Sequence, residues 1–100
     1  MVDSFFDTHT ECLIIQVKAR FDYHCQKAFK EAFLSVKNVM SYEVNLANVL
    51  HLDSSALGML LLLRDHAGER STQIRLVHVN RAVINTLKMA NFHRLFEITE

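Results

Sequence analysis

The residues from Asn45 to Leu62, NLANVLHLDSSALGMLLL, decide the fold of this 100-residue chain. Apolar and polar residues alternate over residues 42–48, which is the period of a β-strand. After Asp53 the pattern changes, and from residue 54 to about residue 67 the apolar residues follow helical spacing. Gly68 comes next, a favoured residue just past the end of a helix. The stretch therefore predicts a strand that leads through a short connection into a helix.

Strand and helix patterns alternate on both sides of this stretch. Residues 12–19, CLIIQVKA, are rich in branched apolar side chains and predict a strand, and residues 1–7 carry a weaker strand pattern. Asp22 can cap a helix over residues 23–36. Beyond Gly68 the sequence predicts a strand at 74–79, a helix at 81–90 and a last strand at 95–98.

The order of these elements predicts the fold class. Alternation of strand and helix from the second strand onward indicates strand-helix-strand crossovers and largely parallel pairing. We expect an α/β fold with a small sheet of about four to five strands and three or more helices. The first helix should face the core with Cys25, Phe29, Ala32, Phe33 and Val36. The third helix carries the apolar residues Val83, Ile84, Leu87 and Met89.

Length and charge narrow the function classes. One hundred residues suit one domain over 1–100 without a linker. Eleven basic residues balance eleven acidic ones, so the chain lacks the positive field that attracts nucleic acid or anionic lipid. The longest apolar run, residues 56–63, is far shorter than the roughly 20 residues needed to cross a bilayer. We therefore expect no direct nucleic-acid partner and no membrane partner.

The two cysteines and the N-terminus indicate a cytoplasmic protein. Cys12 and Cys25 lack a CxxC spacing, and free cysteines of this kind are commonly buried and reduced. The N-terminal sequence MVDSFFDTHTE has no basic region followed by an apolar stretch, as an export signal would.

The Asp53-Ser54-Ser55 segment is the candidate functional site. It lies at the predicted start of a helix, where backbone N–H groups lack helical partners and can receive an anion. Asp and Ser are also preferred helix caps, so the segment can be read as a cap alone. Glu or Gln three residues further on, which would complete a capping box, is missing. The residues alone leave both readings open.

The segment DSSALG, followed by a Leu-rich helix and preceded by the strand VNLAN, resembles the STAS domain of bacterial anti-sigma factor antagonists. The likeness extends over nearly the whole chain, because LIIQVKARFDYHCQKAFKEAF resembles the family's second strand and first helix, and NFHRLFEI its closing segment. Ala56 departs from the family's usual Gly, which makes the backbone less permissive and removes no chemistry. The resemblance implies a single STAS domain with a small sheet of mixed direction.

The resemblance also implies a regulatory role without catalysis or cofactor. In this family the phosphorylated Ser or Thr directly follows the Asp, which corresponds here to Ser54 with Asp53 and Ser55 as flanking motif residues. The unphosphorylated protein binds an anti-sigma factor, often also its serine kinase, and so releases the sigma factor. Phosphorylation stops this binding, and a serine phosphatase restores it.

The predicted helix after Ser54 offers a surface for such a partner. Steps of 100° per residue place most of its apolar residues on one broad face, and Met59 and Leu62 opposite them. We expect Met59 and Leu62 to form part of the docking patch. A helix that is apolar all round can instead be covered by its own domain, and the sequence leaves this alternative open.

Metal and catalytic sites have little support in the sequence. The histidines are scattered without HxH or HxxxH spacing. A nucleophilic Ser54 would need a base and an oxyanion site, and the GxSxG signature is absent. We therefore expect no enzyme, no cofactor and no metal site.

Two other functions stay open at this point. A constitutive STAS subunit of a transporter or other assembly would use Asp53 and Ser54 only to cap the helix. A module that binds a small ligand or nucleotide would use the same helix N-terminus. The sequence does not name the sigma factor, kinase or phosphatase, the regulated pathway, or the oligomeric state.

Overall fold

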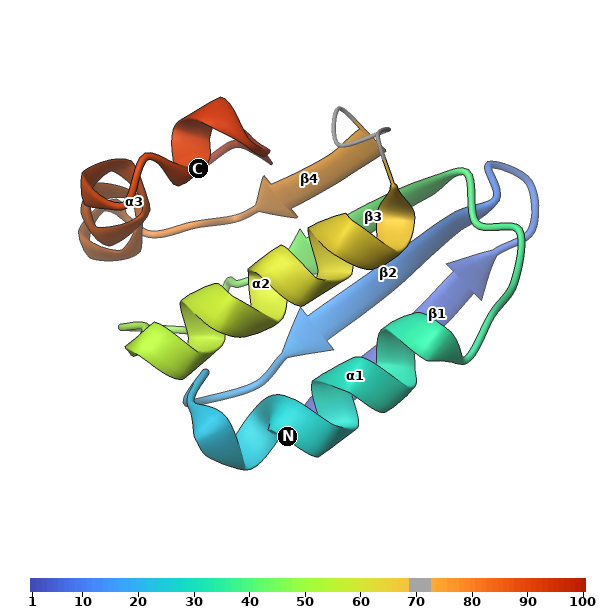
Figure 1. Cartoon of the computed structure of the whole chain (residues 1–100), viewed down its shortest axis with the longest axis horizontal. Coiled ribbons are helices and arrows are strands. Elements are labelled where there is room, and N and C mark those ends of the chain that lie inside the picture. Colours follow the sequence, from blue (N-terminus) through green and yellow to red (C-terminus); the bar gives the residue numbers. More distant parts are fainter. Residues whose placement is uncertain (69–72) are drawn as a thin grey trace.

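The computed structural model describes residues 1–68 and 73–100. Within these residues, five strands, three α-helices and two 3-10 turns follow one another (Figure 1). Their bounds are β1 Val2–Asp7, β2 Cys12–Val17, η1 Tyr23–Cys25, α1 Gln26–Leu34, β3 Ser41–Asn45, α2 Ser54–Ala67, β4 Ile74–Val77, α3 Arg81–Met89, η3 Phe92–Arg94 and β5 Glu97–Ile98.

The five strands form one sheet in the order β1-β2-β3-β4-β5. β1 pairs antiparallel with β2, and the other neighbours pair parallel. A helix lies between each parallel pair in the sequence, because a parallel strand is reached only by a crossover that returns the chain to the same end of the sheet. The predicted α/β class and the small, largely parallel sheet are confirmed.

Each α-helix except α1 begins at a side-chain cap. The carboxylate of Asp53 accepts a hydrogen bond from the N–H of Ala56 at the start of α2, and the amide oxygen of Asn80 accepts one from the N–H of Val83 at the start of α3. Asp22 caps η1, which leads into α1. Gly68 ends α2 at a φ of 79°, which glycine adopts without steric cost.

α1 and α2 lie side by side on one face of the sheet (Figure 1). Alternate residues of the central strands point toward these helices, as the two-residue period requires, and the buried residues form one apolar cluster. On the strands they are Leu13, Ile15, Val17, Tyr42, Val44, Ile74 and Leu76. α3 and η3 add Val83, Leu87 and Phe92 to the same cluster.

The structure shortens several predicted elements. The expected helix over 23–36 divides into η1 and α1 and ends at Leu34, so Val36 lies beyond the helix and is only partly buried. Cys25, Phe29, Ala32 and Phe33 face the core as predicted. The predicted last strand over 95–98 contains only two strand residues. Met89 of α3 is 86% exposed and contributes nothing to the core.

Candidate functional site

Asp53, Ser54 and Ser55 lie at the N-terminus of α2, near the ends toward which the parallel strands run (Figure 1). A parallel bridge between Phe21 and Leu52 joins the segment after β2 to the segment before α2. The bridge fixes the backbone immediately before Asp53. The segment that leads into α2 is therefore joined to the segment after β2, which gives the serines a defined position.

The side chain of Asp53 forms two hydrogen bonds. One oxygen, Oδ1, accepts from the hydroxyl of Ser55 at 2.7 Å and from the N–H of Ala56 at 2.9 Å. The Ser55 hydroxyl, and next the Ala56 N–H, hold the pKa of the Asp53 carboxyl below its usual value. Asp53 is therefore ionised at neutral pH and caps the helix, so the predicted cap is present.

Ser54 differs from its neighbour in both exposure and bonding. Ser54 is exposed, whereas Ser55 is half-buried and donates its hydroxyl to Asp53. Within the described residues the Ser54 hydroxyl forms no hydrogen bond, since the cap is complete without it. Of the two serines, Ser54 is the one that another protein can reach without breaking a bond.

The exposed side of α2 is defined by its burial pattern. Ala56, Met59, Leu60 and Leu63 face the core, whereas Leu61 is 42% and Leu62 45% exposed. At 100° per residue, an arc of about 100° contains the residues that we call the Ser54 face. They are Ser54, Gly58, Leu61, Leu62 and Asp65. Leu61 lies about 10 Å along the helix axis from Ser54, at a rise of about 1.5 Å per residue.

The expected surface position of Met59 is wrong. Its side chain is 2% exposed and packs in the core, so it cannot contact another protein in the folded chain. Leu62 is on the surface as expected, and Leu61 takes the place assigned to Met59. The sequence could not decide this, because a helix with leucine at four consecutive positions has no polar side that marks the direction of solvent.

A small groove lies on the loops that precede the two helices. Its volume is about 220 Å³, and its lining residues are Ala19, Arg20, Asn48, Leu50 and His51. Leu50 is 75% exposed, although it lies only four residues before Ser54. An exposed leucine near a candidate binding segment is a candidate contact residue. The sequence pattern did not single out Leu50.

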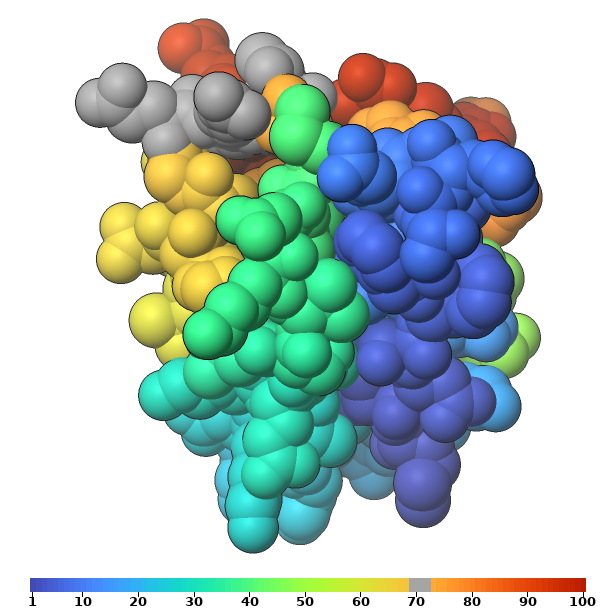
Figure 2. All heavy atoms as spheres, turned by 90° about the vertical axis from the view of Figure 1, so that its right-hand side faces the viewer, coloured from blue at the N-terminus to red at the C-terminus, as the bar shows by residue number. Residues whose placement is uncertain are grey.

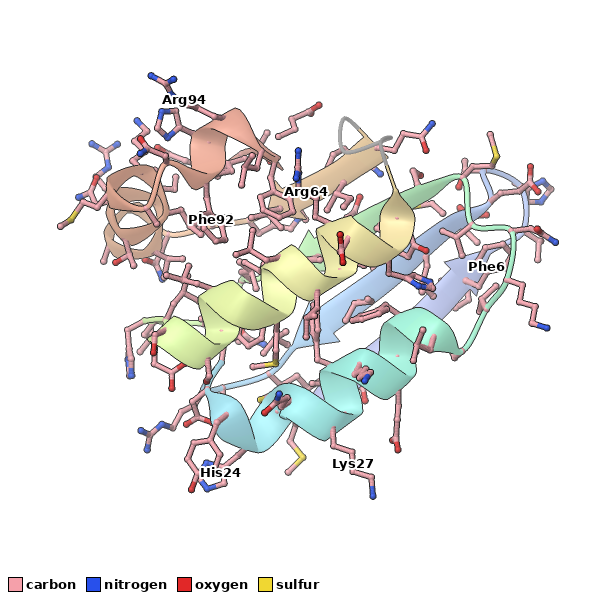
Figure 3. The ribbon with its side chains drawn as sticks, viewed as in Figure 1. Phe6, His24, Lys27, Arg64, Phe92 and Arg94 are labelled. Carbon is pink, nitrogen blue, oxygen red and sulfur yellow. The ribbon has the colours of Figure 1, made fainter. Side chains whose placement is uncertain are left out.

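The remaining candidate sites stay without structural support. Among residues 1–68 and 73–100, no group of three or more His, Cys, Asp or Glu side chains is placed to hold a metal ion. His24 and Lys27 point away from the molecule (Figure 3). The described helices include none with the length and apolar character needed to span a membrane. Cys12 and Cys25 are free and buried, as predicted.

Comparison with known proteins gives the family. The family model described as Mlab, STAS domain, matches residues 4–98. A STAS-domain containing protein of Pseudomonas aeruginosa is 46% identical over 88 residues, which cover 87% of each chain. The chain belongs to the STAS domain family, as its resemblance predicted.

Solved structures share the fold. A putative anti-sigma factor antagonist from Thermotoga maritima has a TM-score of 0.84 at 18% identity, covering 98% of this chain and 85% of its own. A sulfate transporter family protein from Wolinella succinogenes has a TM-score of 0.78 at 14% identity, covering 89% and 76%. The Bacillus cell fate determinant SpoIIAA in its phosphorylated form has a TM-score of 0.68 at 12% identity, covering 100% and 92%. At these identities the likeness concerns the fold alone.

Proposed function

We propose that this chain is a cytoplasmic anti-sigma factor antagonist that is regulated by phosphorylation of Ser54. The observation that supports this most directly is the exposed hydroxyl of Ser54, which has no hydrogen-bond partner among the described residues and lies beside Ser55 and Asp53, which are bonded to each other. The unphosphorylated chain binds an anti-sigma factor that is also its serine kinase, and a serine phosphatase reverses the modification. The fold shared with anti-sigma factor antagonists supports the same function.

A phosphate on Ser54 changes the surface without unfolding the domain. It adds about 1.5 to 2 negative charges at the N-terminus of α2, where the helix dipole favours an anion by about 0.3 to 1 kcal/mol at an exposed position. The Asp53 cap needs no rearrangement, because its bonds go to Ser55 and Ala56. The helix therefore stays in place when Ser54 is modified.

The same phosphate opposes a partner docked on the Ser54 face. Leu61 and Leu62 give this face an apolar contact area two turns from Ser54. A partner that covers them also removes water from the start of the helix, where a phosphate and the ionised Asp53 would lose hydration and repel each other. Partner release follows from charge and desolvation at one end of the contact.

Phosphorylation is tested with the cognate anti-sigma factor kinase and ATP. Mass spectrometry should find one phosphate on the wild type and on Ser55→Ala, and none on Ser54→Ala. Ser55→Ala is the matched control, because it removes the neighbouring hydroxyl and keeps the exposed one. A phosphate retained by Ser54→Ala would place the modification elsewhere and contradict the proposal.

Docking is tested on the Ser54 face with the purified anti-sigma factor. Replacing Leu61 and Leu62 together by Lys should weaken binding at least about tenfold, since each buried leucine contributes roughly 1.5 to 3 kcal/mol at a contact. Met89→Lys is the control, because Met89 is 86% exposed on α3 and lies outside this face. Equal binding by the double variant and the control would exclude the Ser54 face as the docking surface.

A constitutive subunit of a transporter or other assembly is the alternative function. The fold likeness to a sulfate transporter family protein favours it specifically. In that case Asp53 caps α2 and Ser54 carries no phosphate. Purification of the tagged chain from its native cell distinguishes the two functions: membrane transport subunits in stoichiometric amounts with unmodified Ser54 support the alternative.

A further inference from the structure

A second cavity lies at the opposite end of α2 from Ser54. Its volume is about 510 Å³, which is within the range of small-molecule sites. The segment after α1, the start of β3 and the last turn of α2 contribute to its walls. Figure 2 views the molecule from this end, with residues 34–40 in green beside the yellow end of α2.

The described polar residues that line this cavity include several hydrogen-bond donors. Tyr42 is only 6% exposed, and its hydroxyl forms no hydrogen bond within the described part of the chain although it borders the cavity. Burial raises the pKa of Tyr42, so its hydroxyl keeps its proton and can donate. Lys37 adds an ammonium group, and Asn38 and Gln73 add side-chain amides. A group rich in acceptor oxygens would satisfy these donors.

The cavity also has an aromatic wall. The ring of His66 lies 5.1 Å from that of Phe33 and 6.5 Å from that of Tyr42, measured between ring centroids. Val36 and Val39 line the cavity beside these rings. Aromatic rings stack on one another at such separations, and of these three rings those of His66 and Tyr42 belong to lining residues, which can contact a flat aromatic ligand.

The charge around the cavity favours an anion. Lys37 is a full positive charge in the lining, and the lining residues that the structure describes include no Asp or Glu. Two helices end here, and one carbonyl in the last turn of each is satisfied: that of Ala32 accepts from the Ser35 hydroxyl at 2.7 Å, and that of Arg64 from the Gly68 N–H at 3.1 Å. These hydrogen bonds offset part of the negative field of the helix ends, and Lys37 is the only Lys, Arg, Asp or Glu among the described lining residues.

We propose that this cavity binds a small aromatic carboxylate, with the ring against His66 and the carboxylate toward Lys37 and the Tyr42 hydroxyl. Binding here does not require phosphorylation of Ser54 or contact with an anti-sigma factor. The inference therefore stands apart from the proposed function.

The test is a titration of the isotope-labelled full chain with benzoate, followed by amide chemical shifts. Benzoate should shift the amides of residues 36–42 and 66–67 and saturate with a Kd of about 1 to 10 mM, as expected for so small a ligand. Benzylamine has the ring with the opposite charge, and acetate has the charge without the ring. Each should bind at least about tenfold more weakly.

Two substitutions tie the binding to the proposed groups. Lys37→Gln should weaken benzoate binding roughly tenfold, and Tyr42→Phe should weaken it roughly threefold to tenfold, because one removes a charged donor and the other a neutral one. Lys27→Gln is the matched control, since Lys27 points away from the molecule on α1 (Figure 3). Because Lys37 is exposed, its replacement should not disturb folding, so weaker benzoate binding by Lys37→Gln would not result from a folding defect.

Three results would overturn the proposal. The first is the absence of benzoate-dependent shifts in the residues around the cavity. The second is binding of benzylamine as tight as that of benzoate, which would exclude recognition of an anion. The third is unchanged benzoate binding in both Lys37→Gln and Tyr42→Phe.

Discussion

Neighbouring serines at the start of α2 show how one hydrogen bond separates two roles. Ser55 donates its hydroxyl to Asp53 and is half-buried, so it belongs to the helix cap. Ser54 is exposed, and within the described residues its hydroxyl has no partner. The sequence pattern predicted the position of this segment and a cap by Asp53 or Ser54. Only the geometry shows that Asp53 is the cap and distinguishes the hydroxyl that is bonded from the one that is accessible.

Replacement of Asp53 should reveal how much the cap contributes to the free energy of unfolding and how this contribution depends on pH. Asp53→Ala should lower the free energy of unfolding by about 1 kcal/mol at neutral pH, whereas Asn, also a good cap, should keep most of it. The carboxyl pKa is lower in the folded chain than in the unfolded chain. The ionised cap therefore stabilises the fold fully above the unfolded pKa of about 4, and this contribution is lost as the pH falls through the lower folded value.

The measurement is urea unfolding of the wild type and Asp53→Asn across acidic pH. The stability advantage of the wild type should shrink on acidification, because only its cap can take up a proton. The carboxyl pKa of Asp7 is also lowered, first of all by the hydrogen bond that it accepts from the His9 N–H. Asp7 is present in both chains, so its contribution to the pH dependence of stability cancels in the comparison. A difference that stays constant with pH would contradict the assigned hydrogen bonds.

At the scale of the element, the bounds of α2 were predicted well, but the side of the helix that faces solvent was not. Its bounds, Ser54–Ala67, and its end at Gly68 agree with the pattern, because a cap at one end and a glycine at the other are local signals. Its rotation was not predictable, since its apolar residues surround the helix, and so Met59 was placed on the surface. Of the four apolar residues noted in the third helix, Val83 and Leu87 are buried, whereas Met89 is exposed.

Gly58 is an unusual residue for the middle of α2. A Cβ atom built on it meets nothing within 4 Å, and its φ is not positive. Gly58→Ala should therefore raise the free energy of unfolding by about 0.5 to 1 kcal/mol, measured by urea denaturation. Because Gly58 lies on the Ser54 face, the docking proposal predicts weaker binding of the anti-sigma factor by this more stable variant. Lower stability of the variant would show a steric conflict that the structure lacks.

At the scale of the whole molecule, the order of elements was sufficient to predict the parallel sheet. The resemblance implied a sheet of mixed direction but did not say which strand is antiparallel. The pairing of Phe5 with Ile14 and of Phe6 with Leu13 identifies it as β1. The second cavity was beyond sequence reasoning, because its walls come from segments that meet only in the folded chain. Local patterns carry no information about such distant contacts.

The buried cysteines provide a measure of unfolding for the whole chain. Cys12 is 5% and Cys25 4% exposed, and they lie in different elements. In native buffer both thiols should react slowly with a thiol reagent such as Ellman's reagent, because reaction requires opening of the core. In rising urea both should become reactive at the midpoint measured by circular dichroism. Rapid labelling of either thiol in the absence of urea would contradict its burial.

The antiparallel strand β1 has a consequence for shortened forms of this domain. β1 covers the side of β2 that is not paired with β3, so a chain shortened by its first seven residues would present the backbone of CLIIQV as an open border. An exposed apolar edge strand can pair with strands of other molecules, and such pairing leads to aggregation. An affinity tag that replaces those residues would therefore change solubility before it changed anything at Ser54.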